Sequence, residues 1–241
     1  MKEYSIIIPV HNESSSLEEN VDLLDDFMQK LGSSYEIIIA EDGSTDKTYS
    51  IAKELAERKH NVKVIHSKER LGKGAALTRA IMSSEGQTVA FMDADIAVDL
   101  KDLAELLRSV EQNCEVVVGS RLIKGSTVKR PPLRSLTSRI YNICTNILFR
   151  DGICDHQCGL KGFQRQVAAE VLPQMHSTGW VWDTEFLLRT IKAGYTVHEI
   201  PVSWQERRVK TSVKAFKLAP IMVFELLKLW VREPTLSLGS K

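Results

Sequence analysis

The chain has 241 residues, of which 43% are hydrophobic and 26% charged, and it carries a formal net charge of +1 at pH 7. This composition belongs to a folded protein with room for one sizeable core, and it excludes an intrinsically disordered chain. A charge so close to zero gives no general attraction to nucleic acid, which we do not expect as a partner. No run of about 18 apolar residues occurs, and the opening MKEYSIIIPV reads as a strand, so neither a spanning helix nor a signal peptide is expected.

Short apolar segments alternate with helical patterns through the first half of the chain. The predicted strands cover residues 4–10, 35–46, 61–66, 87–95 and 114–121, the second of them breaking into a turn. The predicted helices cover residues 16–31, 47–59, 72–84 and 100–110. Continuously apolar strands between amphipathic helices predict an α/β fold, with a mostly parallel, Rossmann-like sheet sandwiched by helices. Ligands of such a sheet bind beyond the carboxyl ends of its strands.

The second half of the chain is more basic. No acidic residue occurs between Arg121 and Arg150. Residues 136–149 predict a helix with apolar positions at Leu136, Ile140, Ile143, Ile147 and Leu148. A helix over 184–194 and a strand over 195–204 follow, and then a second basic stretch with Arg207, Arg208, Lys210, Lys214 and Lys217. We divide the chain into a domain over 1–205, with halves 1–121 and 122–205, and a basic, amphipathic helical extension over 206–241.

The basic stretches allow two interpretations. Cationic side chains near apolar residues such as Ile140, Phe224 and Trp230 are typical of helices that lie on an anionic membrane. The same apolar positions also fit helices that pack on the sheet and leave the basic residues in water. We expect peripheral membrane contact, with packing on the sheet as the alternative.

The four cysteines are Cys114, Cys144, Cys154 and Cys158. They are too sparse for a disulfide framework, which favours a reducing, cytoplasmic compartment. The spacing in CDHQC differs from that of zinc ribbons, and no second pair follows it. We therefore expect small packed residues there and no metal site.

Two carboxylates end the fourth predicted strand. Asp93 and Asp95 follow an apolar run, with Ala94 between them. Acids so close together repel each other unless a positive charge lies beside them. Mg²⁺ takes one or two carboxylates together with phosphate oxygens, so the pattern predicts a cation that bridges to a diphosphate. Capping of the next helix is the alternative, although a cap needs one acid only.

Other strand ends strengthen this interpretation. Asp42 ends the second predicted strand, and Lys73 lies between Gly72 and Gly74, where the backbone approaches phosphate closely at a helix start. Together with the Asp93–Asp95 pair, the segments IIIPVHNE, IIIAEDGSTDKT and NVKVIHSKERLGKGAAL resemble family 2 glycosyltransferases of the GT-A fold, over nearly the whole chain. The segments DHQCGLKGFQRQVAAEVL and GWVWDTEFLLRTIKAGYTVHEIPVSWQER are similar to the dolichyl-phosphate glucosyltransferase branch, which is close to the dolichyl-phosphate mannose synthases. That branch usually reads D-T-Q-C-G-F-K, so His156 and Leu160 depart from it.

The resemblance implies roles for individual residues. It places nine residues at the nucleotide sugar, namely Pro9, His11, Glu13, Asp42, Lys73, Asp93, Ala94, Asp95 and Arg121. Within this set Asp42 reads the base, Asp95 and Asp93 hold Mg²⁺ or Mn²⁺, and Arg121 meets the donor phosphates. The position of a third ligand, a glutamine in many mannose synthases, holds Ala97, as in the glucosyl branch.

The resemblance also implies an acceptor site at Arg134, Ser138 and Arg207. The late motif that contains Arg207 is degraded in this chain, because Lys210 replaces its glycine and its lysine comes late, at Lys214. The catalytic residues implied are Asp93, Asp95, Arg121 and Arg207.

The resemblance implies an inverting hexosyltransferase, and we expect it to move a hexose from UDP-glucose or GDP-mannose to dolichyl or another polyprenyl phosphate at the cytosolic face of a membrane. A phosphate acceptor is already anionic at pH 7 and needs no general base. We therefore expect Asp183 and Glu185 to have an orienting or structural role. The main alternative is transfer to a hydroxyl group of a glycan.

Three other classes fit less well. A nucleotidyltransferase needs a glycine-rich loop after the first strand, which here reads PVHNESSS, and a dinucleotide oxidoreductase needs G-x-G-x-x-G, of which GKGAAL lacks the third glycine. A module that only binds lipid or nucleic acid leaves Asp42, Asp93 and Asp95 unexplained.

Overall fold

The structure is a computed structural model that describes residues 2–205 and 212–237. Its main sheet has the strand order β3-β2-β1-β4-β7-β5-β8, and a small second sheet pairs β6 with β9. The strands are β1 (Tyr4–Val10), β2 (Tyr35–Asp42), β3 (Val62–Ser67), β4 (Thr88–Phe91), β5 (Val116–Ser120), β6 (Thr127–Lys129), β7 (Lys161–Gln164), β8 (Val197–Pro201) and β9 (Ser203–Gln205). Within the main sheet only β7 is antiparallel to its neighbours, β4 and β5.

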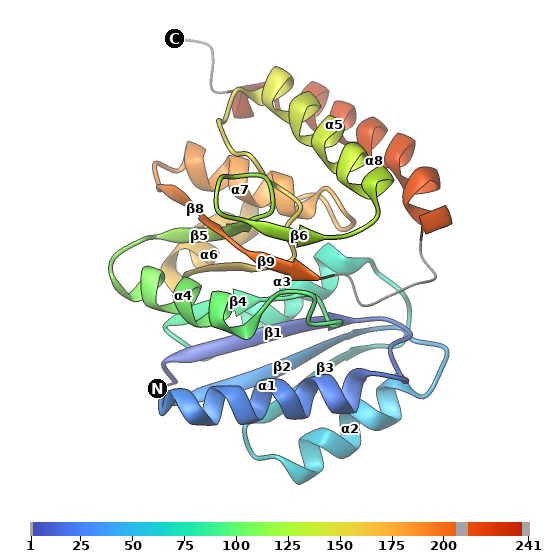
Figure 1. The fold of residues 1–241 in the computed structure, drawn as a ribbon, viewed down its shortest axis with the longest axis vertical. Coiled ribbons are helices and arrows are strands. Elements are labelled where there is room, and N and C mark those ends of the chain that lie inside the picture. The colour runs from blue at the N-terminus through green and yellow to red at the C-terminus, as the bar shows by residue number, and fades with distance from the viewer. Residues whose placement is uncertain (1, 206–211, 238–241) are drawn as a thin grey trace.

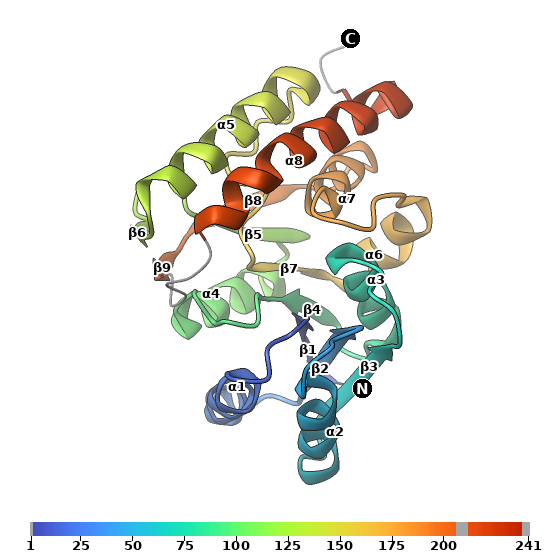
Figure 2. The same cartoon turned by 90° about the vertical axis from the view of Figure 1, so that its right-hand side faces the viewer.

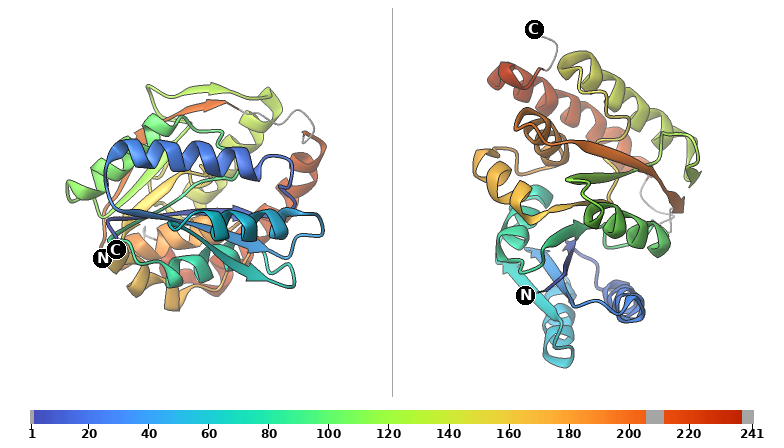
Figure 3. Two further views of the ribbon diagram at one scale, coloured as in Figure 1. Left: turned by 90° about the horizontal axis from the view of Figure 1, so that it is seen from below. Right: turned by 90° about the vertical axis from the view of Figure 1, so that its left-hand side faces the viewer.

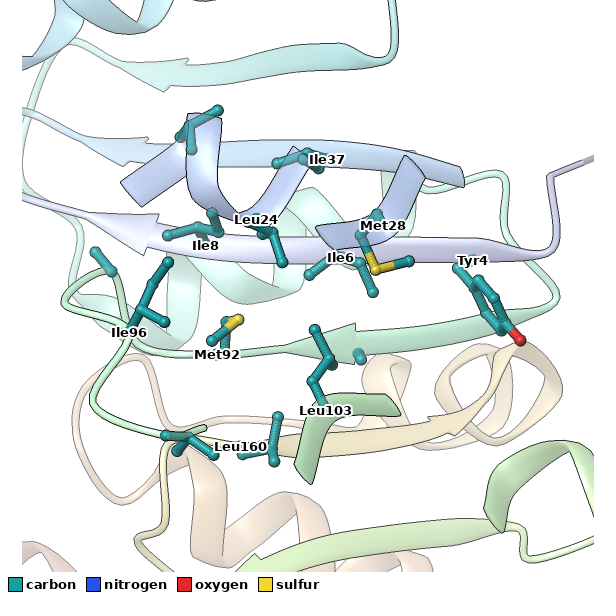
Figure 4. Packing of buried hydrophobic residues seen from close by; sticks show 14 of the residues in the cluster. Tyr4, Ile6, Ile8, Leu24, Met28, Ile37, Met92, Ile96, Leu103 and Leu160 are labelled. Atoms are coloured by element: carbon teal, nitrogen blue, oxygen red, sulfur yellow. The ribbon is translucent and has the colours of Figure 1, made fainter. Parts of the chain in front are cut away.

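Helices cover both faces of this sheet. They are α1 (Leu17–Leu31), α2 (Thr48–Arg58), α3 (Lys73–Ser83), α4 (Leu100–Glu111), α5 (Pro132–Phe149), α6 (Arg165–Val171), α7 (Trp182–Lys192) and α8 (Ser212–Arg232), with short 3₁₀ turns at Leu172–Gln174 and Pro234–Leu236. Successive strand residues point to opposite faces. Ile6 and Ile8 therefore pack with α1, α2 and α4, as Figure 4 shows for Leu24 and Met28 of α1, whereas Ile7 packs with α3, α6 and α7. The predicted sandwich of a mostly parallel sheet between helices is confirmed.

A third apolar cluster joins α5 to α8. The two helices run side by side at one end of the molecule, opposite α1 and α2 (Figures 1, 2 and 3). Tyr141 and Phe149 of α5 pack there with Leu188 of α7 and with Leu226 and Leu229 of α8. The apolar positions predicted on α5 lie mostly on its other side, where Leu136, Ile140, Ile143 and Ile147 are 47–69% exposed. The alternative that this stripe packs on the sheet is wrong.

Some elements differ from the predicted ones. The strand predicted over 195–204 divides at Val202 into β8 and β9, which belong to different sheets. The N–H of Val202 donates to the carbonyl oxygen of Ser120 at the end of β5, and its carbonyl oxygen accepts from the N–H of Thr127 of β6. The fourth strand ends at Phe91, so Asp93 and Asp95 lie in the loop that follows it. The structure contains no helix, within the residues it describes, that is long and apolar enough to cross a membrane.

Candidate active site

The candidate site lies at the carboxyl ends of β1, β2 and β4. Parallel pairing sets Pro9 beside Ala40 and Ile7 beside Phe91, so the loops that leave these strands meet at one edge of the sheet. His11 follows β1, and its Nδ1 lies 2.8 Å from the main-chain oxygen of Asp42, at the end of β2. Two of the residues predicted to bind the nucleotide sugar, His11 and Asp42, are thus brought together at the ends of the first two strands.

Asp42 has a structural task at this edge. Its carboxylate accepts hydrogen bonds from the main-chain N–H groups of Leu71, at 2.8 Å, and Gly72, at 2.9 Å. Gly72 has φ of +105°, and a Cβ there would lie 2.5 Å from the carbonyl oxygen of Thr178, so only glycine fits. Asp42 therefore fixes the turn that starts α3 at Lys73, and its contact with a base stays a prediction.

The loop after β4 carries Asp93 and Asp95, the two acids that are predicted to hold a metal ion. Asn20 of α1 donates a 2.7 Å hydrogen bond to the carbonyl oxygen of Ala94 and so holds the loop in place. Ile96 has φ of +43°, a rare conformation for a β-branched residue, and its N–H donates to the carbonyl of Asp93 at 3.1 Å. Strained backbone of this kind clusters at functional sites, where the surrounding structure supports it. Ile96 therefore marks this loop as a candidate site.

Asp93 is bound by a lysine. Lys73 Nζ lies 2.9 Å from Asp93 Oδ1, and the Asp93 side chain is 35% exposed. Burial alone raises the pKa of this carboxyl, but the Lys73 ammonium overrides that effect and lowers the pKa. A Cβ at Gly159 would lie 2.0 Å from Asp93 Oδ2, so the backbone closes against the carboxylate. Asp93 is thus held ionised and in place by the protein itself.

A divalent cation at this loop would use oxygen ligands. Asp93 and Asp95 are both partly exposed, and Mg²⁺ and Mn²⁺ prefer carboxylate and phosphate oxygens, so these residues fit such an ion. Among residues 2–205 and 212–237, no three or more His, Cys, Asp and Glu side chains form a group that could hold a metal. Diphosphate oxygens and water would therefore complete the coordination.

Arg121 is held by a carboxylate that the sequence did not single out. Its Nε and a terminal nitrogen donate to the two oxygens of Asp155 at 2.7 and 2.9 Å, and its guanidinium lies 4.8 Å from the centre of the Trp204 ring. Burial alone raises the pKa of Asp155, but Arg121 lowers it to about 2. The pair is almost fully buried, so Arg121 is fixed at the end of β5 rather than free to swing.

This pair predicts acid sensitivity. A carboxyl whose pKa is lowered on folding stabilises the protein above its ordinary pKa of 3.8, and this stabilisation disappears as the pH falls toward 2. The shift corresponds to about 2 kcal/mol. Between pH 5 and pH 2, the unfolding free energy of the wild type should fall by about 2 kcal/mol more than that of Asp155→Asn, measured by urea denaturation. Equal falls in the two proteins would contradict this account.

Lys161 and Asp183 extend the charged cluster. Lys161 is fully buried on β7 and donates to Asp183 Oδ1 at 2.8 Å, while Asp183 Oδ2 lies 3.9 Å from Lys73 Nζ. A lysine inside the apolar sequence GLKGF was the signal that could have revealed this pair. Glu185 accepts from the main-chain N–H groups of His176 and Ser177 and pairs with Arg189 at 2.8 Å. Both acids of this helix are therefore occupied in holding the fold.

Two of the three predicted acceptor residues, Arg134 and Ser138, lie on α5. Arg134 and Ser138 are four residues apart, so they share one side of the helix, and Ser138 is buried. Asn142, one turn further along, accepts from the N–H of His156 at 2.9 Å and so connects α5 to the loop that carries Asp155. Glu13 lies after β1, where its N–H donates to Thr48 at 2.7 Å. Arg207 lies outside the residues that the structure describes.

Comparisons with known proteins agree with this geometry. Residues 5–172 match the profile described as glycosyl transferase family 2. Glycosyltransferase AglD of Haloferax volcanii is 34% identical over 233 residues, which cover 95% of this chain and 37% of that protein. A dolichyl-phosphate beta-glucosyltransferase of Dictyostelium discoideum is 34% identical over 216 residues, which cover 84% of this chain and 66% of that protein. The chain thus spans about a third to two thirds of the length of these two relatives.

Solved structures show the same fold. Glucosyl-3-phosphoglycerate synthase from Mycobacterium tuberculosis, in complex with Mn²⁺, UDP and glucosyl-3-phosphoglycerate, superposes with a TM-score of 0.70. The match covers 94% of this chain and 78% of that one, at 16% sequence identity. The family profile spans more than half of the chain, and the sheet, the two acids after β4 and the GT-A architecture agree with it. The chain belongs to glycosyl transferase family 2.

Proposed function

We propose that this protein is an inverting hexosyltransferase that moves a hexose from a nucleotide diphosphate sugar to a polyprenyl phosphate. The relative from Dictyostelium discoideum is named a dolichyl-phosphate beta-glucosyltransferase, which favours glucose as the sugar. Asp93, Asp95, Lys73 and Arg121 are the residues that we assign to the donor.

One observation carries the choice of acceptor. The two carboxylates that could serve as a general base, Asp183 and Glu185, are each engaged by a buried cation, Lys161 and Arg189 respectively. A hydroxyl acceptor must lose a proton during attack, whereas a phosphate monoester is already anionic at pH 7. This pairing supports a phosphate acceptor and disfavours the hydroxyl alternative.

The chemistry that we propose is direct displacement. An acceptor phosphate oxygen attacks the anomeric carbon from the side opposite the diphosphate, and the configuration inverts. Lys73 and Arg121 place positive charge beside the donor, where it stabilises the negative charge that develops on the leaving diphosphate. A bound Mg²⁺ or Mn²⁺, held by Asp95 and Asp93, would neutralise further charge on the diphosphate.

We also propose that α5 and α8 form the membrane-contacting face. Among the side chains that the structure describes on these helices, the exposed large apolar ones are Leu133, Leu136, Ile140, Ile143 and Ile147 on α5, and Ile221, Phe224, Leu227, Trp230 and Val231 on α8. Arg139 of α5, Arg150 directly after it, and Lys228 and Arg232 of α8 are also exposed. Apolar and cationic groups on adjacent helices suit an anionic lipid surface, where the polyprenyl chain of the acceptor resides.

Charge placed on this face should weaken binding to lipid. Ile143→Glu combined with Phe224→Glu should lower binding to anionic vesicles at least about tenfold in a flotation assay, since each side chain contributes about 2 kcal/mol when buried. Met82→Glu is the matched control, because Met82 is 72% exposed on the distant helix α3. Unchanged binding in the double variant, or an equal loss in the control, would contradict this assignment.

The proposed function is tested by transfer of label. Purified protein with Mn²⁺ and dolichyl phosphate should move label into the organic phase from UDP-glucose or, in a parallel tube, from GDP-mannose. Transfer of label to dolichyl phosphate from only one of the two donors identifies both the reaction and the sugar. Transfer to a glycan hydroxyl, with none to dolichyl phosphate, would replace the proposal with its alternative.

A further inference from the structure

Lys161 is a fully buried lysine beside the donor site. Its ammonium donates to the carbonyl oxygen of Cys158 at 2.7 Å and to Asp183 Oδ1 at 2.8 Å, and it lies 5.4 Å from the centre of the Phe91 ring. Lysine is almost never fully buried unless its charge is paired. The side chain that pairs with it is Asp183, and this pair has no assigned task in the reaction.

Asp183 lies one side chain away from the donor carboxylate Asp93. Its Oδ2 is 3.9 Å from Lys73 Nζ, and the same ammonium is 2.9 Å from Asp93 Oδ1. Asp183 is also in the first turn of α7, and its side chain is 5% exposed. At this position the Asp183 carboxylate is close enough to the donor site to accept a proton from a nucleophile there, unless another group already binds the carboxylate.

We propose that Lys161 is a specificity-determining residue that prevents Asp183 from acting as a general base, so that the enzyme uses only acceptors that are already anionic. This inference rests on the proposed function. Lys161 Nζ lies 2.8 Å from Asp183 Oδ1 and Lys73 Nζ lies 3.9 Å from Asp183 Oδ2, so each oxygen of the carboxylate faces a cation.

The reaction that Lys161 suppresses is hydrolysis of the donor. In that reaction a water oxygen bonds to the anomeric carbon, and the bond from that carbon to the diphosphate breaks, with its electron pair staying on the phosphate oxygen. The proton of the water goes to the Asp183 carboxylate. Replacement of Lys161 by methionine keeps much of the length of the side chain and removes its ammonium, which frees Asp183 Oδ1 for this proton.

The test compares Lys161→Met with Lys161→Met/Asp183→Asn, using Mn²⁺ and UDP-glucose. The measured quantity is UDP release without acceptor, relative to transfer to dolichyl phosphate. Lys161→Met should raise this ratio about tenfold or more, because a freed general base accelerates attack by water. The double variant should return to the wild-type ratio.

Other results would overturn the inference. The inference is wrong if folded Lys161→Met has the same ratio of UDP release to transfer as the wild type. It is also wrong if hydrolysis rises in Lys161→Met and stays raised in the double variant. If Lys161→Met does not fold, Asp183→Asn decides, since asparagine still accepts a hydrogen bond from Lys161 Nζ. Its transfer to dolichyl phosphate should fall less than about tenfold, and a loss of a hundredfold or more would make Asp183 catalytic. Failure of the wild type to transfer to dolichyl phosphate would instead refute the proposed function.

Discussion

Asp95→Ala is expected to lower hexosyl transfer at least about a thousandfold and to abolish the metal dependence of nucleotide binding. Asp95 is the carboxylate of the loop after β4 that we assign to the cation, and its neighbour Asp93 is already paired with Lys73. Without Asp95 the charge of the diphosphate is poorly neutralised, and each lost factor of ten corresponds to about 1.4 kcal/mol of barrier. Transfer rates and calorimetric titration of UDP with and without Mn²⁺ measure both effects.

Asp99→Ala is the matched control for this variant. Asp99 lies in the same loop, and its Oδ1 accepts from the N–H of Lys101 at the start of α4. Loss of this helix cap should cost about 1 kcal/mol of stability and leave transfer within about twofold of wild type. The metal assignment would be wrong if Asp95→Ala kept metal-dependent binding, or if both variants lost activity equally.

The second large effect is expected for Arg121→Lys. Lysine keeps the charge but loses the planar fork that donates to both oxygens of Asp155. Because the pair is buried, we expect a loss of about 3 kcal/mol in unfolding free energy and about a hundredfold in transfer. Urea denaturation and initial rates at saturating donor are the measurements.

Arg108→Lys provides the comparison for a surface pair. Arg108 binds Glu105 on α4 with both side chains more than half exposed, so the change should cost less than about 0.5 kcal/mol and leave transfer unchanged. If Arg121→Lys were equally mild, Arg121 would neither be fixed by Asp155 nor contribute to the donor site.

Local patterns were sufficient to predict most strands of the main sheet and the meeting of Asp42 and Asp93 at its carboxyl edge. Continuous apolar runs identify β1 and β2, and the carboxyl ends of parallel strands must meet, which is why the sequence alone places Asp42 and the Asp93–Asp95 pair at one edge of the sheet. The Asp93–Asp95 pair is visible because two acids so close together after an apolar run are costly without a cation. The domain boundaries at 121 and 205 stay predictions.

Local sequence patterns could not predict contacts between segments that lie far apart in the chain. Lys161 pairs with Asp183 across 22 positions, and Arg121 with Asp155 across 34, and neither spacing has a local signature. β7 was not predicted because its sequence KGFQ has no alternation, and its place between β4 and β5 comes from pairing across the chain.

The local sequence also does not determine whether the apolar side of a helix is buried or exposed. Periodicity on α5 predicts a helix with an apolar side but does not say what that side meets. In the structure the side with Tyr141 and Phe149 is covered by α7 and α8, which leaves Ile143 and Ile147 exposed. The packing of α7 and α8 against α5 decides between the two sides.

The most direct test of the account is NMR spectroscopy of the product that the Mn²⁺-loaded enzyme makes from UDP-α-glucose and a short polyprenyl phosphate. The account predicts a β-anomeric proton with a coupling to ³¹P, because an anionic phosphate oxygen attacks the side of the sugar opposite the leaving diphosphate. An α-anomeric product, or a new glycosidic bond without phosphorus coupling, would contradict it.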